Sequence, residues 1–214
     1  MKLGIYIVAV LINYLIGSIP FAYIIPLKVS GKDIRLIGSG NVGATNVYRA
    51  IGPIWGVVVF LLDMLKGYIA AYISTMIITK EQFTIKLTGF SVNHEIILLS
   101  VIIWAVIGHI FPVFLGFMGG KGVSTSCGIF ICLIPHAMEV TMVIWILVTS
   151  ISRYVSLGSM VGALFFPILV YYFGGSVVIT TFSTLISIII FLTHLGNIKR
   201  IISGEELRIG ERPR

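Results

Sequence analysis

Long apolar segments make up most of this chain. Seven of them are predicted as helices, at residues 4–27, 54–79, 95–117, 123–135, 138–151, 157–173 and 176–193. A helix needs about 20 apolar residues to cross a bilayer, and by this measure 123–135 and 138–151 are short. The mean hydropathy is +1.07, and only 11% of the residues are charged, as is typical of integral membrane proteins. The sequence therefore predicts an all-α integral membrane protein with about seven transmembrane helices, some of them short.

The polar stretches between these segments are short. The longest lie at about 28–53, 80–94 and 194–214 and leave no room for a soluble domain, so we expect residues 1–214 to form one membrane domain. No small-residue cleavage site follows the first apolar segment, which is unlike a cleaved signal peptide. Cys127 and Cys132 lie inside an apolar segment and, with four scattered histidines, indicate neither a disulfide framework nor a metal site.

The cations are unevenly distributed over the connections between the predicted helices. With seven helices, eleven cations fall on one side: Lys28, Lys32, Arg35, Arg49, Lys121, Arg153, Lys199, Arg200, Arg208, Arg212 and Arg214. The other side holds Lys2, Lys80 and Lys86. Cytoplasmic connections carry an excess of Lys and Arg, so the pattern predicts a cytoplasmic C-terminus and an N-terminus outside. This distribution indicates no nucleic-acid partner, despite a net charge of +7.

The stretch 123–151 decides this topology, because it can be one long helix or two short ones. Pro135, His136 and Glu139 interrupt its middle, and proline disrupts a helix interior. One fused helix would also place Arg153 and the basic tail outside, against the charge rule. Two short helices are therefore preferred. All the polar, glycine-rich connections then meet on one face.

Two glycine-rich runs, 39–49 and 108–125, interrupt the apolar sequence. Such backbone cannot face hydrocarbon, where its N–H and C=O groups would lack partners, so it must line a water-accessible pocket. The first run sets small polar residues beside Arg49, whose planar fork of donors suits phosphate. The alternative is an ordinary loop whose arginine anchors to anionic lipid head groups. The polar and glycine neighbours of Arg49 favour a binding site.

The second run places three glycines around Lys121. It fails the nucleotide P-loop template, since Leu115 stands where a glycine is needed and Gly122 where Ser or Thr is needed. Phosphate binding remains the preferred interpretation of this run, whereas ATP hydrolysis is rejected. The alternative is a glycine-rich turn with a snorkelling lysine. His109 and Pro112, in the same run, are expected to shape the end of the third helix.

Three further groups of polar residues remain. Arg153 lies among hydroxyl residues at 152–159, which suits either a membrane anchor or an anion contact. Asp63 and Lys66 share one face of the second predicted helix, and we expect an internal structural ion pair there. His194 and Asn197 lie one turn apart if the last helix continues.

Together, the runs 39–49, 108–125, 152–159 and 194–205 resemble the signatures of the bacterial acyl-phosphate:glycerol-3-phosphate acyltransferase family. They occur in the same order over nearly the whole chain, which makes the resemblance far more specific than any one glycine run. The resemblance implies a transmembrane acyltransferase domain in the bacterial inner membrane, with its active site on the cytoplasmic face. It would transfer an acyl group from acyl phosphate to the 1-hydroxyl of glycerol 3-phosphate, giving lysophosphatidic acid and phosphate for phospholipid biosynthesis.

The resemblance also implies the site. Its catalytic residues would be Ser39, Arg49, Lys121, His194 and Asn197. Its other substrate-binding residues would be Gly40, Asn41, Gly43, Thr45, Asn46, Gly119, Gly120, Gly122, Ser156, Ser159 and Glu205. No cofactor or metal is implied. The partners would be the two substrates and membrane lipid, and the oligomeric state stays open.

The chemistry of acyl phosphate agrees with such a site. It is an activated mixed anhydride, so positioning and charge stabilisation can supply much of the rate without a protein nucleophile. His194 then serves as a phosphate ligand or as a general base, and the sequence leaves both open. Two other functions also remain open: a membrane carrier for phosphate or organic anions, and a non-catalytic protein that binds anionic lipid.

Overall fold

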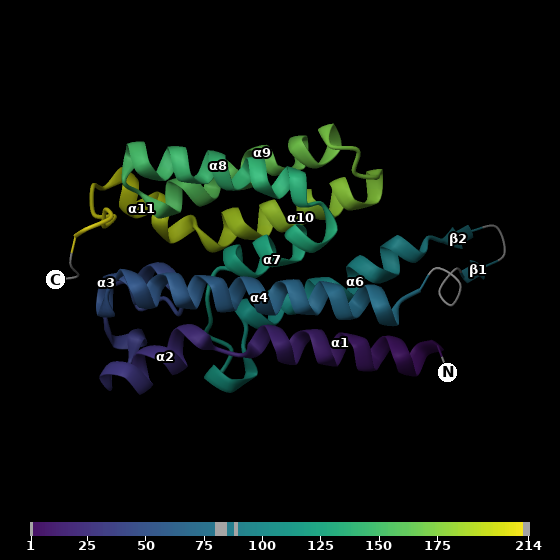
Figure 1. Ribbon diagram of the computed structural model, residues 1–214, viewed down its shortest axis with the longest axis horizontal. Coiled ribbons are helices and arrows are strands. Elements are labelled where there is room, and N and C mark those ends of the chain that lie inside the picture. Colours follow the sequence, from purple (N-terminus) through teal and green to yellow (C-terminus); the bar gives the residue numbers. More distant parts are fainter. Residues whose placement is uncertain (1, 80–84, 88–89, 212–214) are drawn as a thin grey trace.

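The chain folds as a bundle of helices (Figure 1), described by a computed structural model at residues 2–79, 85–87 and 90–211. The helices are α1 (Lys2–Ser18), α2 (Phe21–Ser30), α3 (Ala44–Ile51), α4 (Pro53–Ile77), α6 (His94–Ile110), α7 (Val123–Leu133), α8 (Pro135–Ser152), α9 (Val155–Tyr172), α10 (Val177–Thr193) and α11 (Leu195–Ile202). The shorter elements are the 3-10 turns η1 (Ile34–Leu36) and η2 (Val113–Leu115) and the antiparallel strands β1 (Ile85–Leu87) and β2 (Phe90–Val92). All seven predicted segments are helical, so the all-α prediction is confirmed.

Not every apolar helix is long enough to span a bilayer. By length and composition, the described residues contain five spans: Leu3–Ser30, Pro53–Ile77, His94–Leu115, Pro135–Ser152 and Val155–Tyr172. The pair α10 and α11 makes a sixth if it counts as one span with a bend of 51°. Helix α7 is apolar but has only 11 residues. The sequence predicts about seven transmembrane helices. The described residues have five or six spans and the short helix α7 in their place.

The first span is broken, which the hydropathy pattern did not predict. Helix α1 ends at Ser18, and α2 begins at Phe21 after Pro20. Proline has no N–H to donate and its ring clashes with the preceding turn, so the helix cannot run straight through. Helix α2 ends at Ser30. Its C-cap, Gly31, has a φ of 67° that suits glycine, and the Gly31 N–H donates to the Leu27 carbonyl over 3.0 Å. At the break, the Ile19 carbonyl accepts from Lys66 Nζ over 2.9 Å.

The stretch 123–151 forms two helices, as predicted. Helix α7 ends at Leu133, Ile134 leaves the helical region, and α8 starts with Pro135 in its first turn. Proline fits that place because the first N–H groups of a helix have no intrahelical acceptor. Helix α7 packs against α4, whereas α8 packs against α9 (Figure 1).

Small residues allow two pairs of helices to pack closely. A Cβ atom added at Gly17 of α1 would overlap the Ala105 backbone in α6, and one added at Gly128 of α7 would overlap the Met64 carbonyl in α4. Membrane helices use small residues in this way, because close packing replaces the hydrophobic effect between them. Helix α4 contacts both α1 and α7 and joins the two halves of the bundle.

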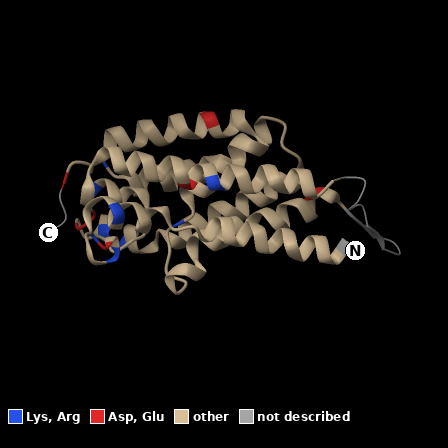
Figure 2. Ribbon diagram, turned by 60° about the horizontal axis from the view of Figure 1, so that its bottom comes forward, with Lys and Arg blue, Asp and Glu red and all other residues tan. Residues whose placement is uncertain are grey.

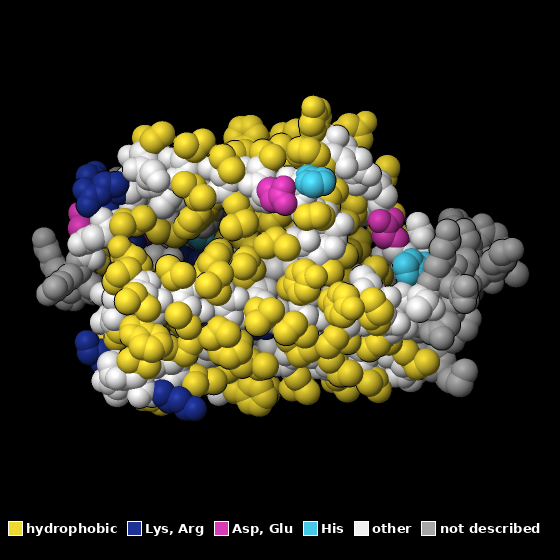
Figure 3. Space-filling view, viewed as in Figure 1, with side chains coloured by type: hydrophobic (Ala, Val, Ile, Leu, Met, Phe, Trp, Pro, Cys, Tyr) yellow, Lys and Arg dark blue, Asp and Glu magenta, His cyan; other side chains and the backbone are white. Residues whose placement is uncertain are grey.

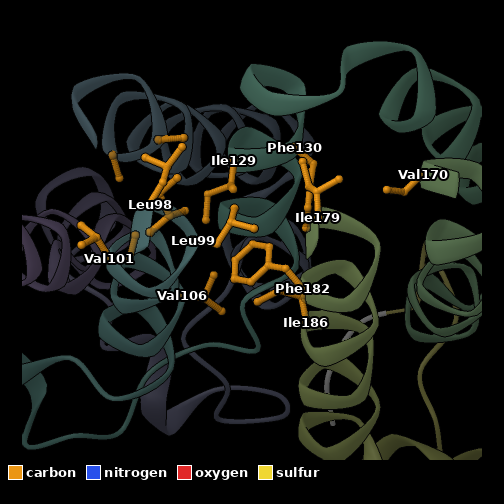
Figure 4. Packing of buried hydrophobic residues seen from close by; sticks show 14 of the residues in the cluster. Leu98, Leu99, Val101, Val106, Ile129, Phe130, Val170, Ile179, Phe182 and Ile186 are labelled. Atoms are coloured by element: carbon orange, nitrogen blue, oxygen red, sulfur yellow. The ribbon is translucent and has the colours of Figure 1, made fainter. Parts of the chain in front are cut away.

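Buried apolar side chains from seven helices, α1, α4, α6, α7, α8, α9 and α10, form the core, part of which is drawn in Figure 4. Phe130 of α7 packs against two other rings, with centroid distances of 4.5 Å to Phe166 of α9 and 5.7 Å to Phe182 of α10. Leu99 and Val106 of α6 belong to the same cluster. The tilted rings suit aromatic quadrupoles, and the cluster ties the short helix α7 to its longer neighbours.

Polar motifs gather at one end of the bundle. Figure 2 shows Lys and Arg concentrated at the end that carries the C-terminus, and the N-terminus lies at the other. At that end Arg49 donates to the Leu207 carbonyl, and Arg153 Nη2 donates to the Ile209 carbonyl over 2.8 Å. The four motif runs therefore meet, as predicted. Which side of the membrane this end faces stays a prediction, and Lys80, Arg212 and Arg214 lie outside the described residues.

Candidate active site

A cavity opens at the polar end, among α3, α4, α7, α9 and the junction of α10 with α11. It encloses about 740 Å³, part of it open to solvent. The predicted site residues that line it are Ser39, Asn41, Gly43, Thr45, Asn46, Arg49, Lys121, Ser156, Ser159, His194 and Asn197. Figure 3 shows a hollow in one flank, with basic and histidine atoms at its bottom and hydrophobic side chains around its mouth. Residues far apart in the sequence are thus brought together.

The loop before α3 is organised by one buried side chain, Asn46. Its amide group donates to the carbonyls of Ile34 and Ile37 over 3.1 and 2.9 Å, and its Oδ1 accepts from the Ser39 N–H at 3.3 Å. Asn46 therefore holds the loop in shape. Gly40 is absent from the cavity lining, and its φ of 67° is its contribution to the turn.

Helix α3 directs its N-terminus towards the cavity. Gly43 is its N-cap, and Ala44 and Thr45 follow as its first residues and line the cavity. The first N–H groups of a helix have no acceptor within it and carry a partial positive charge. An anion in the cavity can accept from them.

Lys121 lies in the connection before α7 and is largely buried. Its Nζ donates to Asn197 Oδ1, and its carbonyl accepts from Thr193 Oγ1 over 3.1 Å. Burial lowers the pKa of Lys121 to about 8; the Glu206 carboxylate opposes this shift, whereas Arg200 adds to it. The ammonium group is thus protonated at neutral pH but close to losing its proton.

The three glycines beside Lys121 do not line the cavity, contrary to expectation. Gly119 N–H donates to the Ile110 carbonyl and Gly120 N–H to the His109 carbonyl, both over 3.0 Å. These donors close the end of α6 and are not free for a substrate. Gly122, with a φ of 85°, is the N-cap of α7. The glycines bring backbone close to backbone and so position Lys121.

His194 stands at the bend between α10 and α11 and is 3% exposed. Its Nδ1 lies 2.7 Å from the Ile190 carbonyl oxygen. A carbonyl oxygen only accepts, so Nδ1 carries the hydrogen, and in a neutral ring Nε2 then holds the lone pair. Neutral His194 is thus an acceptor towards the cavity and suits a hydroxyl better than a phosphate oxygen.

Comparison with known proteins decides the family. A sequence model described as glycerol-3-phosphate acyltransferase matches residues 7–204. The chain belongs to this family. A glycerol-3-phosphate acyltransferase of Syntrophomonas wolfei is 40% identical over 199 residues, covering 93% of this chain and 94% of the relative. Glycerol-3-phosphate acyltransferase 2 of Moorella thermoacetica is 38% identical over 207 residues, covering 97% and 99%.

Two solved structures of PlsY, an integral membrane glycerol 3-phosphate acyltransferase, share the fold. The glycerol 3-phosphate form has a TM-score of 0.83 and 36% identity, covering 96% of each chain. The lysophosphatidic acid form has a TM-score of 0.79 and 35% identity, covering 96% of this chain and 95% of that one. These matches confirm the resemblance seen in the sequence.

In this acyltransferase Glu206, and not the predicted Glu205, lines the cavity. Glu205 is exposed, whereas Glu206 accepts from Ser156 Oγ at 2.9 Å, from Asn197 Nδ2 at 2.7 Å and from Arg200 Nε at 2.8 Å. Burial raises the pKa of Glu206, but these hydrogen bonds outweigh it and hold the pKa below its ordinary value. The carboxylate therefore ties the tail to α9 and α11.

An apolar cavity continues from the polar one. It shares Phe60, Val123, Trp145 and Ser159 with the polar cavity and encloses about 580 Å³. Trp145 Nε1 donates to Ser159 Oγ over 3.2 Å at this boundary. The sequence singled out Ser159 but not Phe60, Val123 or Trp145, because apolar residues inside a membrane helix carry no signal of their own.

Proposed function

We propose that this acyltransferase uses acyl phosphate as its donor and forms lysophosphatidic acid and phosphate. One observation carries the proposal: a phosphate-suited cavity, with Arg49 and Lys121, adjoins an apolar cavity. Each substrate carries a phosphate group, and the donor also carries an acyl chain. The polar cavity suits the phosphate groups, and the apolar cavity suits the acyl chain.

Three groups would hold phosphate in this proposal. An ammonium group has three donors, and Asn197 takes one from Lys121, so two are left for a substrate. Arg49 gives one donor to the Leu207 carbonyl and keeps the rest of its fork. The N-terminus of α3 adds backbone donors. Two phosphate groups can be shared among these sites.

The acyl chain would enter the apolar cavity. Phe60, Val123 and Trp145 line both cavities, so the acyl carbonyl would lie at this boundary with its phosphate on the polar side. The hydrophobic flank around the hollow in Figure 3 suits entry from the lipid phase.

The reaction is a direct acyl transfer. The 1-hydroxyl oxygen of glycerol 3-phosphate forms a bond to the acyl carbonyl carbon, and the bond from that carbon to the phosphate oxygen breaks. Phosphate leaves with the electron pair. The hydroxyl proton goes to the lone pair on His194 Nε2, and the departing phosphate is the rival acceptor. Lys121 and Arg49 would stabilise the negative charge on the leaving group.

The polar end is proposed to face the cytoplasm of a bacterial inner membrane. The excess of Lys and Arg at this end supports that orientation. Membership of an acyltransferase family favours an enzyme over the alternative of a phosphate or organic-anion carrier. Uptake of labelled glycerol 3-phosphate by proteoliposomes, without product, would favour the carrier.

The donor is tested by comparing three acyl donors with the purified protein. Acyl phosphate should give lysophosphatidic acid, whereas acyl-coenzyme A and acyl carrier protein should give little. The reason is that a coenzyme A or carrier-protein site would need further recognition surface, and the described polar connections 31–43 and 111–122 are short. Comparable rates from acyl-coenzyme A and acyl phosphate would contradict the donor proposal.

A further inference from the structure

A buried ion pair lies in the middle of α4. Asp63 and Lys66 are 2% and 4% exposed, and their Oδ1 and Nζ atoms lie 2.7 Å apart. The predicted pair is thus confirmed. Charges inside a membrane segment are costly and usually serve a function, so the surroundings of this pair are informative.

His109, at the end of α6, lies between this pair and the loop that carries Lys121. Its Nδ1 is 3.7 Å from Asp63 Oδ1, which is just beyond hydrogen-bond distance. On its other side, a Cβ atom at Gly120 would overlap His109 Nε2. The ring therefore fills the space between Asp63 and the residue before Lys121.

The same cluster also holds the break in the first span. Lys66 Nζ donates to the Ile19 carbonyl over 2.9 Å, and Ile19 lies between α1 and α2. Asp63 and His109 line the polar cavity, and both also line a small gap beside Gly120. Neither the acyl transfer step nor phosphate binding, as proposed above, uses these three side chains.

We propose that Asp63 and His109 are positioning residues for Lys121. Asp63, whose Oδ1 lies 3.7 Å from His109 Nδ1, orients the ring by electrostatic attraction. The ring supports the backbone at Gly120, and this support places the Lys121 ammonium at the phosphate. Lys66 compensates the charge of Asp63. The inference rests on the proposed role of Lys121 in phosphate binding.

The test must separate positioning from mere stability, because losing one member of a buried pair leaves an unpaired charge. The double variant Asp63→Asn/Lys66→Met removes both charges and keeps the side-chain sizes. We expect it to stay folded, with Tm lowered only modestly because the Ile19 carbonyl loses its Lys66 donor. It should lose about 10- to 100-fold in kcat/KM for glycerol 3-phosphate. The matched control is His136→Asn/Glu139→Gln, which removes an exposed (i, i+3) pair on α8 and should leave both values unchanged.

A double-mutant cycle with Lys121→Ala supplies the second readout. If Asp63 acts through Lys121, adding the pair replacement to Lys121→Ala should cost no further activity. If the loss of kcat/KM in the combined variant equalled the product of the losses in Lys121→Ala and in the pair replacement, the inference would be overturned. Wild-type kcat/KM in Asp63→Asn/Lys66→Met would also overturn the inference. If Lys121→Ala still lost kcat/KM as expected, the proposed function would stand. Wild-type activity of Lys121→Ala would instead refute the phosphate role itself.

A further variant covers the case in which the double replacement does not fold. His109→Asn keeps an N–H near the position of Nδ1, towards Asp63, but withdraws the ring from Gly120. It should show the same loss of kcat/KM at an unchanged Tm. Full activity in this folded variant would overturn the inference.

Discussion

Replacing Lys121 by alanine removes the ammonium group from the polar cavity. Lys121 Nζ has three donors and Asn197 accepts one, so two remain for the substrate phosphate. A hydrogen bond to a charged group contributes about 1.5–3 kcal/mol. Losing one such bond lowers kcat/KM about 10- to 150-fold. Losing both lowers it further.

The pKa of Lys121 adds a pH signature. Burial lowers it to about 8 from an ordinary value of 10.5, so the ammonium form is lost as pH rises through about 8. The phosphate binding proposed for Lys121 needs that form, so kcat/KM should fall above pH 8. Between pH 8 and 10.5 the unfolded chain binds more protons at this site than the folded one, so this group's contribution to stability rises with pH. The charged lysine is therefore not what stabilises the fold at neutral pH.

The assay measures kcat/KM for glycerol 3-phosphate from pH 6 to 10, with Tm in parallel. Lys121→Ala should lose activity at pH 7 without a lower Tm. Lys121→Arg is the matched control, because it keeps a charge that does not titrate in this range and should remove the fall near pH 8. Wild-type kcat/KM in a folded Lys121→Ala protein would refute the reasoning and leave Lys121 as an interfacial anchor.

Three further predictions concern topology, proton transfer and the tail. In a background without native cysteines, single cysteines at Lys32 and Ser152 should be labelled from one side and a cysteine at Lys86 from the other; equal labelling of Ser152 and Lys86 would contradict the two-helix topology. His194→Gln should lower kcat about 10²–10⁴-fold if Nε2 accepts the hydroxyl proton, whereas a raised KM with substantial kcat would make His194 a phosphate ligand. Glu206→Gln should lower Tm, because three charge-assisted hydrogen bonds weaken, and an unchanged Tm would contradict this.

The elements that the sequence predicted are those on which the bilayer imposes simple rules. Apolar length located the helices, and Pro135 with the charge rule separated α7 from α8. The break at Pro20 was missed, because the segment is apolar on both sides of it. Hydropathy measures transfer to lipid and carries no information on where a helix bends.

Most of the residues predicted for the site line the polar cavity, but not all of them do. Arg49 and Lys121 were found because cations among glycines are conspicuous in an apolar chain. The sequence pointed to Glu205, whereas its neighbour Glu206 lines the cavity. A tail without regular periodicity does not reveal which side chain points inward. His109 was expected only to end a helix, and its contact with Asp63 depends on how α4 and α6 pack.

The backbone of the glycine run 119–122 was also misjudged. Its amides are predicted to cradle phosphate, but those of Gly119 and Gly120 donate to the carbonyls at the end of α6. Those carbonyls lack intrahelical partners, and the nearby loop satisfies them first. Such competition between a ligand and the fold is decided by tertiary packing.

The central claim is that the polar cavity binds the substrate phosphate at Lys121 and Arg49. A structure of this protein with glycerol 3-phosphate tests it most directly. The account predicts the phosphate within hydrogen-bond distance of Lys121 Nζ and the 1-hydroxyl next to His194 Nε2. A phosphate bound instead in the open groove beside Lys32 and Gly210, with none at Lys121, would contradict it.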